Sequence, residues 1–322
     1  MTRGDESQTA AAVLMVRPAG FRANPETAGS NAFQELPGED TERSAREIQA
    51  LAEREFDGLA AALEGAGVRV VRLAARGDGT TPDALFPNNW VSFHADGTVV
   101  LYPMMAPSRR RERREELLAE LVACAGFQVR RIIDLSAHER DGRFLEGTGS
   151  LVLDRVHRIA YACLSPRTDL EALADFGRRL DYETVAFNAS DQGGIPVYHT
   201  NVMMSVGRDF AVVCEEAIGA AGQRDAVRRK LEETGHEVIP ITLQQAAAFA
   251  GNLLELSSAT GERIIALSTS AEACLEAGQR DLLAGRARFA TAAIPTIEAK
   301  GGGSARCMLA ELHLPPKPQR EA

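Results

Sequence analysis

The sequence predicts an α/β fold built as a ring of five similar units. Helical periodicity alternates with short β-branched runs along the whole chain, with no linker between them. One pattern also recurs: a polar or glycine-rich cluster, a short apolar strand, a turn and a second apolar strand. The clusters lie near positions 89, 146, 201, 252 and 307, and this spacing of roughly 50 to 60 residues is typical of a repeat architecture. We expect the clusters to meet around one axis.

Apolar residues at helical spacing predict five helices. In the first, Phe56, Leu59 and Leu63 lie three and four residues apart, and Gly65 ends the pattern. Thr168 with Glu171, and Thr269 with Glu272, are expected to form capping boxes. The predicted helices run from Asp40 to Gly65, Ser108 to Ala125, Thr168 to Leu180, Ala220 to Thr234 and Thr269 to Gly285.

Strands are predicted next to these helices and within the recurring units. Those next to the helices are GVRVVRL, FQVRRIIDL, HEVIPI and RFATAAIPTI. The recurring units are NNWVSFHADGTVVLYPM, EGTGSLVLDRVHRIAYACL, HTNVMMSVGRDFAVVC, GNLLELSSATGERIIAL and GGGSARCMLAELHL. The last unit shows no second strand, and we expect the N-terminal run LMVRP to supply it.

Composition favours a small-molecule partner. The chain has 322 residues and a net charge of −9, which argues against broad binding of nucleic acid or anionic membranes. Because it shows no secretory signal and no long apolar span, we expect a cytoplasmic protein. One catalytic domain is expected at 13–314, with loose tails at 1–12 and 315–322. A homo-oligomer is left open.

Cys307, His199 and Glu146 are the candidate catalytic residues. Cys307 follows the flexible run GGGSAR, His199 precedes an apolar strand, and Glu146 precedes a glycine-containing turn. Together they match a cysteine nucleophile, its base and a group that orients the base. Taken one at a time, a buried structural thiol, a core histidine and a solvated turn carboxylate remain alternatives.

The other patterns in the sequence give weaker evidence of a functional site. Five cysteines, Cys124, Cys163, Cys214, Cys274 and Cys307, are scattered without a CxxC pair, so no disulfide framework or zinc site is expected. The arginine run SRRRERREELL is interpreted as a solvated helix face. We find no nucleotide-binding or metal-binding motif and expect no cofactor or metal.

In combination, four motifs resemble the guanidino-group-modifying superfamily, which includes arginine deiminase, dimethylarginine hydrolase and the amidinotransferases. They are FPNNW, FLEGTGSLVL, YHTNVMM and GGGSARCM, and the resemblance runs from VRPAGF to the last of them. It implies a five-fold pseudosymmetric α/β propeller, the pentein fold. It further implies that Cys307 attacks the guanidino or ureido carbon, His199 shuttles protons and Glu146 positions the site.

Substrate-binding candidates accompany this resemblance. Arg167, in SPRT, resembles a residue that binds the substrate's α-carboxylate; Arg17 and then Arg143 are the next candidates for that role. The full set is Asn89, Asn201, Arg167, Asp83, Arg17 and Arg143.

Two asparagines depart from the usual guanidinium-binding pattern. The superfamily typically has acidic residues at the positions of Asn89 and Asn201, where carboxylates pair with the cation. Since a neutral amide suits a neutral ureido group, the sequence favours citrulline and is most similar to the citrulline-utilising hydrolase subgroup. The expected reaction converts citrulline to ornithine, carbon dioxide and ammonia. Arginine deiminase, arginine dihydrolase, amidinotransferase and a non-catalytic pentein-fold binding protein remain alternatives.

Overall fold

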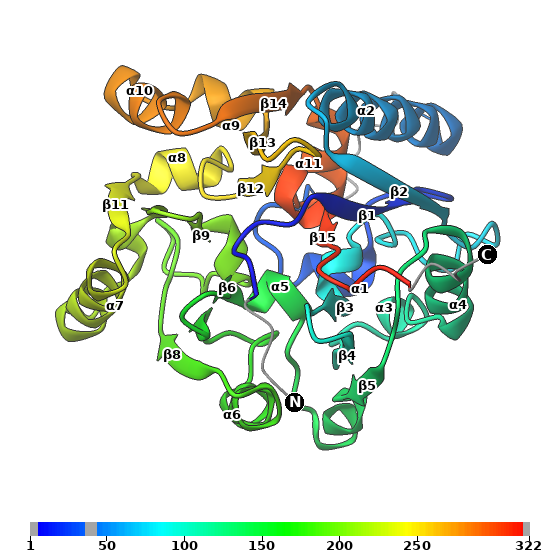
Figure 1. Cartoon of the computed structure of the whole chain (residues 1–322), viewed down its shortest axis with the longest axis horizontal. Helices are drawn as coiled ribbons and strands as arrows, with labels where there is room; N and C mark the ends of the chain where they lie inside the picture. The colour runs from blue at the N-terminus through cyan, green and yellow to red at the C-terminus, as the bar shows by residue number, and fades with distance from the viewer. Residues whose placement is uncertain (1–5, 36–43, 318–322) are drawn as a thin grey trace.

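A computed structural model describes residues 6–35 and 44–317 and places their strands in five three-stranded sheets (Figure 1). The sheet orders are β15-β1-β2, β3-β4-β5, β6-β7-β8, β11-β10-β9 and β12-β13-β14. The strands are β1 (Ala12–Arg17), β2 (Arg69–Ala74), β3 (Val91–Phe93), β4 (Thr98–Leu101), β5 (Arg131–Asp134), β6 (Val152–Asp154), β7 (Ile159–Cys163), β8 (Glu183–Phe187), β9 (Met204–Val206), β10 (Phe210–Val213), β11 (Glu237–Pro240), β12 (Leu254–Ser257), β13 (Arg263–Ser268), β14 (Arg288–Ala292) and β15 (Ala310–Glu311).

All five sheets share one topology. The central strand pairs antiparallel with one neighbour and parallel with the other, as β4 does with β3 and β5. The hairpins predicted from the recurring units are therefore confirmed, and β1 supplies the missing strand by pairing antiparallel with β15. Each parallel partner follows a helical crossover, because parallel strands cannot be joined by a tight turn.

Helices cover the outside of these sheets. Figure 1 shows α2, α4, α6, α7 and α10 at the periphery. The helices are α1 (Pro25–Ala28), α2 (Ala45–Gly65), α3 (Pro107–Arg110), α4 (Glu115–Cys124), α5 (Gly147–Ser150), α6 (Leu170–Leu180), α7 (Ala221–Glu233), α8 (Leu243–Ala247), α9 (Thr269–Ala273), α10 (Ala277–Ala284) and α11 (Pro295–Gly301). Short 3₁₀ helices are η1 (Pro87–Asn89), η2 (Ser136–Asp141), η3 (Thr200–Val202), η4 (Glu215–Ala217) and η5 (Ala305–Met308).

Two predicted helices are broken in the structure. The segment from Ser108 to Ala125 forms α3 and α4, with the intervening arginines turned onto neighbouring loops: Arg110 donates to the Met104 carbonyl and Arg113 to the Tyr102 carbonyl. The segment from Thr269 to Gly285 forms α9 and α10, because Glu276 caps a new helix start.

The predicted helix caps also need correction. Asp169, rather than Thr168, caps α6, and Ser268, rather than Thr269, caps α9. Ser44 caps α2 through a capping box with Glu47, and the expected start at Asp40 lies outside the described residues.

The prediction of loose tails does not hold for the terminal residues that the structure describes. Gln8 donates to the carbonyls of Leu153 and Val206, and Glu6 pairs with the buried Arg155. At the other end, the Lys317 amide donates to the Gly126 carbonyl. Residues 1–5 and 318–322 lie outside the described part of the chain.

The run RFATAAIPTI, which was predicted as a strand, is a strand only in its first part. Strand β14 ends at Ala292, and helix α11 begins at Pro295.

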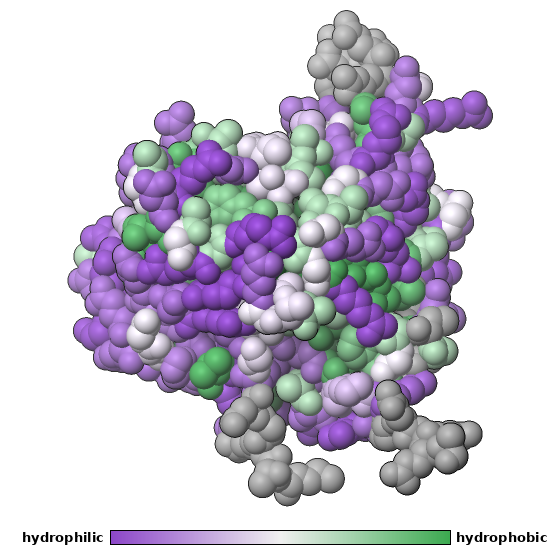
Figure 2. Space-filling view, turned by 45° about the horizontal axis from the view of Figure 1, so that its top comes forward, coloured by the Kyte–Doolittle hydropathy of each residue, from purple (hydrophilic) through white to green (hydrophobic). Residues whose placement is uncertain are grey.

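The sheets pack against one another without a shared ladder in the described residues. Strand β15 contacts β3, β6 contacts β9, and β9 contacts β12. The five-fold propeller symmetry stays a prediction beyond this set of five mixed sheets. The face in Figure 2 is largely hydrophilic, with apolar residues in separated patches, and no helix of the described chain is long and apolar enough to cross a membrane.

Candidate active site

One small cavity collects most of the predicted site residues. Its lining residues are Thr27, Asn31, Asp83, Phe86, Asn89, Arg109, Arg167, Tyr198, His199, Gly301, Gly302, Gly303 and Cys307. Several arise from similar places in the sheets, because a one-turn helix comes just before β3, β6, β9 and β15. Asn89 ends η1, Glu146 precedes α5, His199 precedes η3 and Cys307 lies in η5. The expectation that the polar clusters converge is confirmed for these four.

Cys307 lies buried between two asparagine amides. Its Sγ is 3.2 Å from Asn252 Nδ2 and 3.5 Å from Asn201 Nδ2. Burial raises the pKa of the Cys307 thiol, and donors including these two amides only partly oppose it. The raised pKa favours the neutral thiol, which needs a base to become a nucleophile.

His199 is the base that the site offers. Its Nε2 lies 2.9 Å from Glu146 Oε2, and both side chains are buried. Burial lowers the pKa of His199 to about 4, although the Glu146 carboxylate opposes that shift. Because Glu146 holds Nε2–H, the neutral ring keeps Nδ1 as its proton acceptor.

Glu146 stays ionised despite its burial. Burial would raise its pKa, but Arg167 and the His199 hydrogen bond outweigh that effect and hold the pKa below the usual range. Its other oxygen accepts the Met105 amide at 3.0 Å. This anion can thus orient His199 and stabilise an imidazolium during turnover.

Gly149 makes room for this arrangement. A Cβ there would lie 2.5 Å from Asn89 Nδ2 and 2.7 Å from His199 Nδ1. Any larger residue would push these two side chains out of position. The glycine-containing turn after Glu146 is thus required by close packing.

Arg109 is a site residue that the sequence interpretation missed. The arginine run was interpreted as a solvated face, yet Arg109 is buried and donates to Asn89 Oδ1 at 2.7 Å. Glu112 binds the same guanidinium through two contacts, at 3.1 and 3.0 Å. The run itself does not indicate which arginine turns inward; that depends on the short helix α3 packing beside Asn89.

Asn252 was also missed, although a signal was present. It belongs to the recurring cluster near position 252, in the same place as Asn89 and Asn201 in their units. Repeat position alone could have included it among the candidates.

Asp83 brings a carboxyl group to the cavity. It is buried, its Oδ2 accepts from Asn24 at 2.7 Å, and its Oδ1 has no hydrogen-bond partner among the described residues. Burial raises the pKa of Asp83 while the neighbouring Arg109 opposes the shift. A cationic group bound beside it would favour its ionised form.

Arg167 lies in the cavity, whereas two other predicted binding residues do not. Its guanidinium donates to the Thr27 carbonyl at 2.9 Å and lies 5.1 Å from the centre of the Tyr198 ring. Arg17 instead pairs with Asp57 on the surface, and Arg143 pairs with Glu171 at 2.7 Å. Arg17 and Arg143 therefore lie outside the lining of this cavity, which includes Arg109 beside Arg167.

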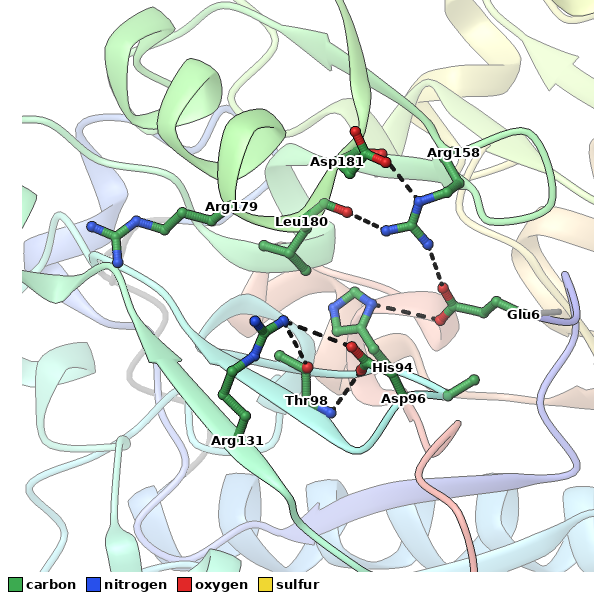
Figure 3. Close-up of a pocket in the computed structure, with 10 residues that line it drawn as sticks. Glu6, His94, Asp96, Thr98, Arg131, Arg158, Arg179, Leu180 and Asp181 are labelled. Atoms are coloured by element: carbon green, nitrogen blue, oxygen red, sulfur yellow. Dashed lines mark hydrogen bonds and ion pairs between the residues drawn. The ribbon is translucent and has the colours of Figure 1, made fainter. Parts of the chain in front are cut away.

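A larger cavity of about 280 Å³ lies apart from these residues. It is lined by Glu6, His94, Arg131 and Arg158 among others (Figure 3). Arg131 contacts Asp96 and Thr98, and Arg158 contacts Glu6, so these charged groups already have protein partners. We place the chemistry in the smaller cavity, where a nucleophile and a base are present.

The remaining described thiols lie outside the site. Cys163, Cys214 and Cys274 are free, and burial raises the pKa of each. The Cys124 side chain lies outside the described set. No group of three or more metal-ligating side chains that could hold an ion occurs in the described chain.

The buried His199 makes stability depend on pH. Its folded pKa of about 4 is below the unfolded value of 6.5, so the unfolded state binds more protons between these values. Stability conferred by neutral His199 is thus present above pH 6.5 and is lost as pH falls to 4, by about 2 to 3 kcal/mol. Urea unfolding from pH 7 to 4 should show a shallower slope for His199→Gln than for wild type. An unchanged slope in His199→Gln would contradict this prediction.

Arg109 should contribute to substrate binding. Replacing it with alanine removes a buried charge beside Asp83 and Asn89, so we expect KM to rise by about 30-fold or more, with a smaller change in kcat. Steady-state kinetics with an α-amino-acid substrate measures this. Arg111→Ala is a neighbouring control from the same run, and an unchanged KM for Arg109→Ala would contradict the assignment.

Comparison with known proteins identifies a family for this chain. The family profile described as "N,N dimethylarginine dimethylhydrolase, eukaryotic" matches residues 17–314. No curated protein matches the sequence.

Solved structures share the fold at low sequence identity. The chain is similar to ArgZ, an arginine dihydrolase from Cyanobacteria, with a TM-score of 0.72 and 19% identity, covering 95% of this chain and 41% of ArgZ. It is also similar to the N-terminal domain of ArgZ, a cysteine-to-serine variant bound to substrate, with a TM-score of 0.70 and 18% identity over 94% of this chain and 99% of that one. A dimethylarginine dimethylaminohydrolase carrying an S-methyl-L-thiocitrulline adduct gives a TM-score of 0.63 and 15% identity over 94% and 100%. The chain thus spans about two fifths of full-length ArgZ.

Proposed function

Because the chain belongs to the N,N-dimethylarginine dimethylhydrolase family, within the guanidino-group-modifying enzymes, we propose that it is an arginine dihydrolase. In this reaction arginine and two waters give ornithine, two ammonia molecules and carbon dioxide. Citrulline is then an intermediate that the same site hydrolyses. The observation that carries the proposal is the buried Asp83 carboxylate in a cavity that also contains Cys307 and His199.

Asp83 favours this reaction over the hydrolysis of citrulline alone. The two asparagines suit a neutral ureido group, but Asp83 offers an unpartnered carboxylate oxygen to a cation. A site with both amides and a carboxylate can hold first a guanidinium and then a ureido group. The arginine dihydrolase ArgZ is similar in fold, which supports the same choice.

The first half-reaction removes one nitrogen. His199 takes the Cys307 proton, and Sγ forms a bond to the guanidino carbon. The resulting tetrahedral adduct expels ammonia, which takes its proton from His199, and a thiouronium remains on Cys307. A variant of the ArgZ N-terminal domain is described as covalently bound to a reaction intermediate, consistent with such chemistry.

Water then completes each round. His199 removes a proton from the water, the oxygen bonds to the carbon, and the C–S bond breaks to release the Cys307 thiolate. The new hydroxyl group gives its remaining proton to solvent, which leaves citrulline. In the second round Sγ attacks the ureido carbon, a second ammonia leaves, and water releases the carbamate of ornithine, which loses carbon dioxide. Amide N–H groups near the sulfur, such as that of Asn201, can stabilise the developing oxyanion.

Product analysis tests the proposal. Purified protein should release ornithine and ammonia in a one-to-two ratio from arginine, and one-to-one from citrulline. Citrulline accumulating from arginine without ornithine indicates a deiminase. Activity with citrulline alone would restore the narrower specificity expected from the asparagines, and dimethylamine released from N,N-dimethylarginine would favour the reaction that gives the family its name.

The asparagines should set the balance between the two substrates. Asn89 Oδ1 already accepts from Arg109, so Asn89→Asp adds a charge that pairs with this arginine, whereas Asn201→Asp adds an unpaired charge beside Cys307. The double variant should lower kcat/KM for citrulline at least tenfold relative to arginine, because a carboxylate cannot donate to the ureido oxygen. The exposed Asn188→Asp serves as a control. An unchanged ratio would show that Asn89 and Asn201 do not discriminate between the substrates.

A further inference from the structure

Asn252 is held by the backbone in a single orientation beside the nucleophile. Its Oδ1 accepts the Arg306 amide at 3.1 Å, and its Nδ2 donates to the Asn201 carbonyl at 2.8 Å. These two contacts identify the oxygen and nitrogen ends of the amide. The second Nδ2 hydrogen remains for Cys307 Sγ, which is 3.2 Å away.

The loop before Asn252 is built for this approach. Asn252 lies between α8 and β12 and is completely buried. At Gly251 an added Cβ would lie 2.7 Å from the Met203 carbonyl carbon and 2.8 Å from the Val202 oxygen. Only glycine lets this loop lie against η3, so the amide is fixed from both sides.

Asn201 contacts the same sulfur differently. Its Nδ2 and Oδ1 lie 3.5 and 3.8 Å from Sγ, compared with 3.2 and 3.6 Å for those of Asn252. Unlike the amide of Asn252, its amide has no backbone contact in the described structure that fixes which end is the donor. Asn201 can turn its amide toward a substrate, whereas Asn252 would have to break two backbone contacts to do so.

We infer that Asn252 is a catalytic hydrogen-bond donor to the Cys307 sulfur, which stabilises the thiolate both before attack and when the C–S bond breaks. This role rests on the proposed cysteine hydrolase function and adds a residue to it. A neutral thiol gains little from such a donor, but a thiolate gains a charge-assisted hydrogen bond. The contribution therefore belongs to the reactive form of the enzyme.

Other titratable and charged side chains also act on the Cys307 sulfur, and the substitutions proposed below at Asn252 replace none of them. The titratable and charged side chains near it, from η3, η5 and the rest of the cavity, are Tyr198, His199, Arg306, Asp83, Arg109, Arg167 and Glu146. None of them is changed when Asn252 is replaced.

The rate of alkylation by iodoacetamide, measured against pH without substrate, reports the Cys307 thiol directly. Cys307→Ala supplies the background from the other thiols. In Asn252→Ala the apparent pKa of Cys307 should rise by about one unit, and kcat should fall by about 10- to 100-fold with KM within about twofold. Asn201→Ala, the matched change on the same sulfur, should shift the thiol less and change KM more.

Asn252→Asp is a second variant that keeps the test decisive if Asn252→Ala does not fold. It keeps the shape and the acceptor for the Arg306 amide but places an oxygen where Nδ2 donated, so it should raise the thiol pKa at least as much as alanine does. A wild-type alkylation profile in either folded variant would overturn the inference. Since alkylation needs no substrate, a raised thiol pKa in a protein inactive on arginine and citrulline would overturn the proposed function and leave the role of Asn252 standing.

Discussion

Cys307→Ala should abolish turnover, lowering kcat by about four orders of magnitude or more. The reason is that Cys307 is the one thiol among the described residues that line the cavity, so no other thiol there can form the bond to the substrate carbon. Acid-quenched wild-type enzyme should carry a mass adduct on the Cys307 peptide, and the variant should carry none.

The control for this experiment is Cys274→Ala. Cys274 is a free, half-buried thiol whose sulfur contacts only carbonyls of Gln245 and Ala271 in the described structure. It should keep wild-type kcat and KM. Comparable activity in Cys307→Ala, with the fold intact by circular dichroism, would remove the nucleophile assignment.

Glu146→Gln should lower kcat by about a thousandfold. The carboxylate holds His199 through Nε2 at 2.9 Å and balances the charge of the imidazolium, and a neutral amide does only part of this. Because Arg167 also faces Glu146 at 3.5 Å, the variant leaves that guanidinium less compensated and should raise KM as well. The pH profile of kcat measures the altered His199 directly.

Glu139→Gln is the matched control for Glu146→Gln. Glu139 accepts the Met104 amide at 2.8 Å just as Glu146 accepts the Met105 amide, and it also pairs with an arginine, Arg113. It is not among the residues that line the cavity, and its carboxylate pairs with the Met104 amide and with arginines rather than with a histidine in the described structure. Equal losses in the two variants would mean that Glu146 acts through folding rather than through His199.

The recurring sequence pattern predicted the features that depend on residues close together in the sequence. Hairpins and the one-turn clusters before them repeat, so the pairing of β1 with β15 and the meeting of Cys307, His199 and Glu146 followed from the pattern together with the resemblance. The break after α3 did not follow, because it comes with side-chain contacts that the pattern does not encode. Arg110, the last residue of α3, donates to the Met104 carbonyl, and Arg113, between α3 and α4, donates to the Tyr102 carbonyl.

Side-chain direction was the main source of error in the site. Arg109 and Arg17 are both arginines near apolar segments, yet one is buried beside Asn89 and the other pairs with Asp57 on the surface. Their sequence neighbours do not distinguish these outcomes. The burial of most of residues 6–12 was missed for a similar reason: Gln8 is polar, but it donates to carbonyls in two different sheets.

The pairing of β1 with β15 has a consequence for folding. Val13 pairs with Glu311, so the first sheet joins segments almost three hundred residues apart. Closing so long a loop costs conformational entropy, and contacts of such high sequence separation slow folding. Cys307 lies just before β15, and the predicted nucleophile is therefore set in place by a pairing between the two ends of the chain. During refolding, recovery of catalysis should accompany the slowest kinetic phase, after most of the helical circular dichroism signal has returned.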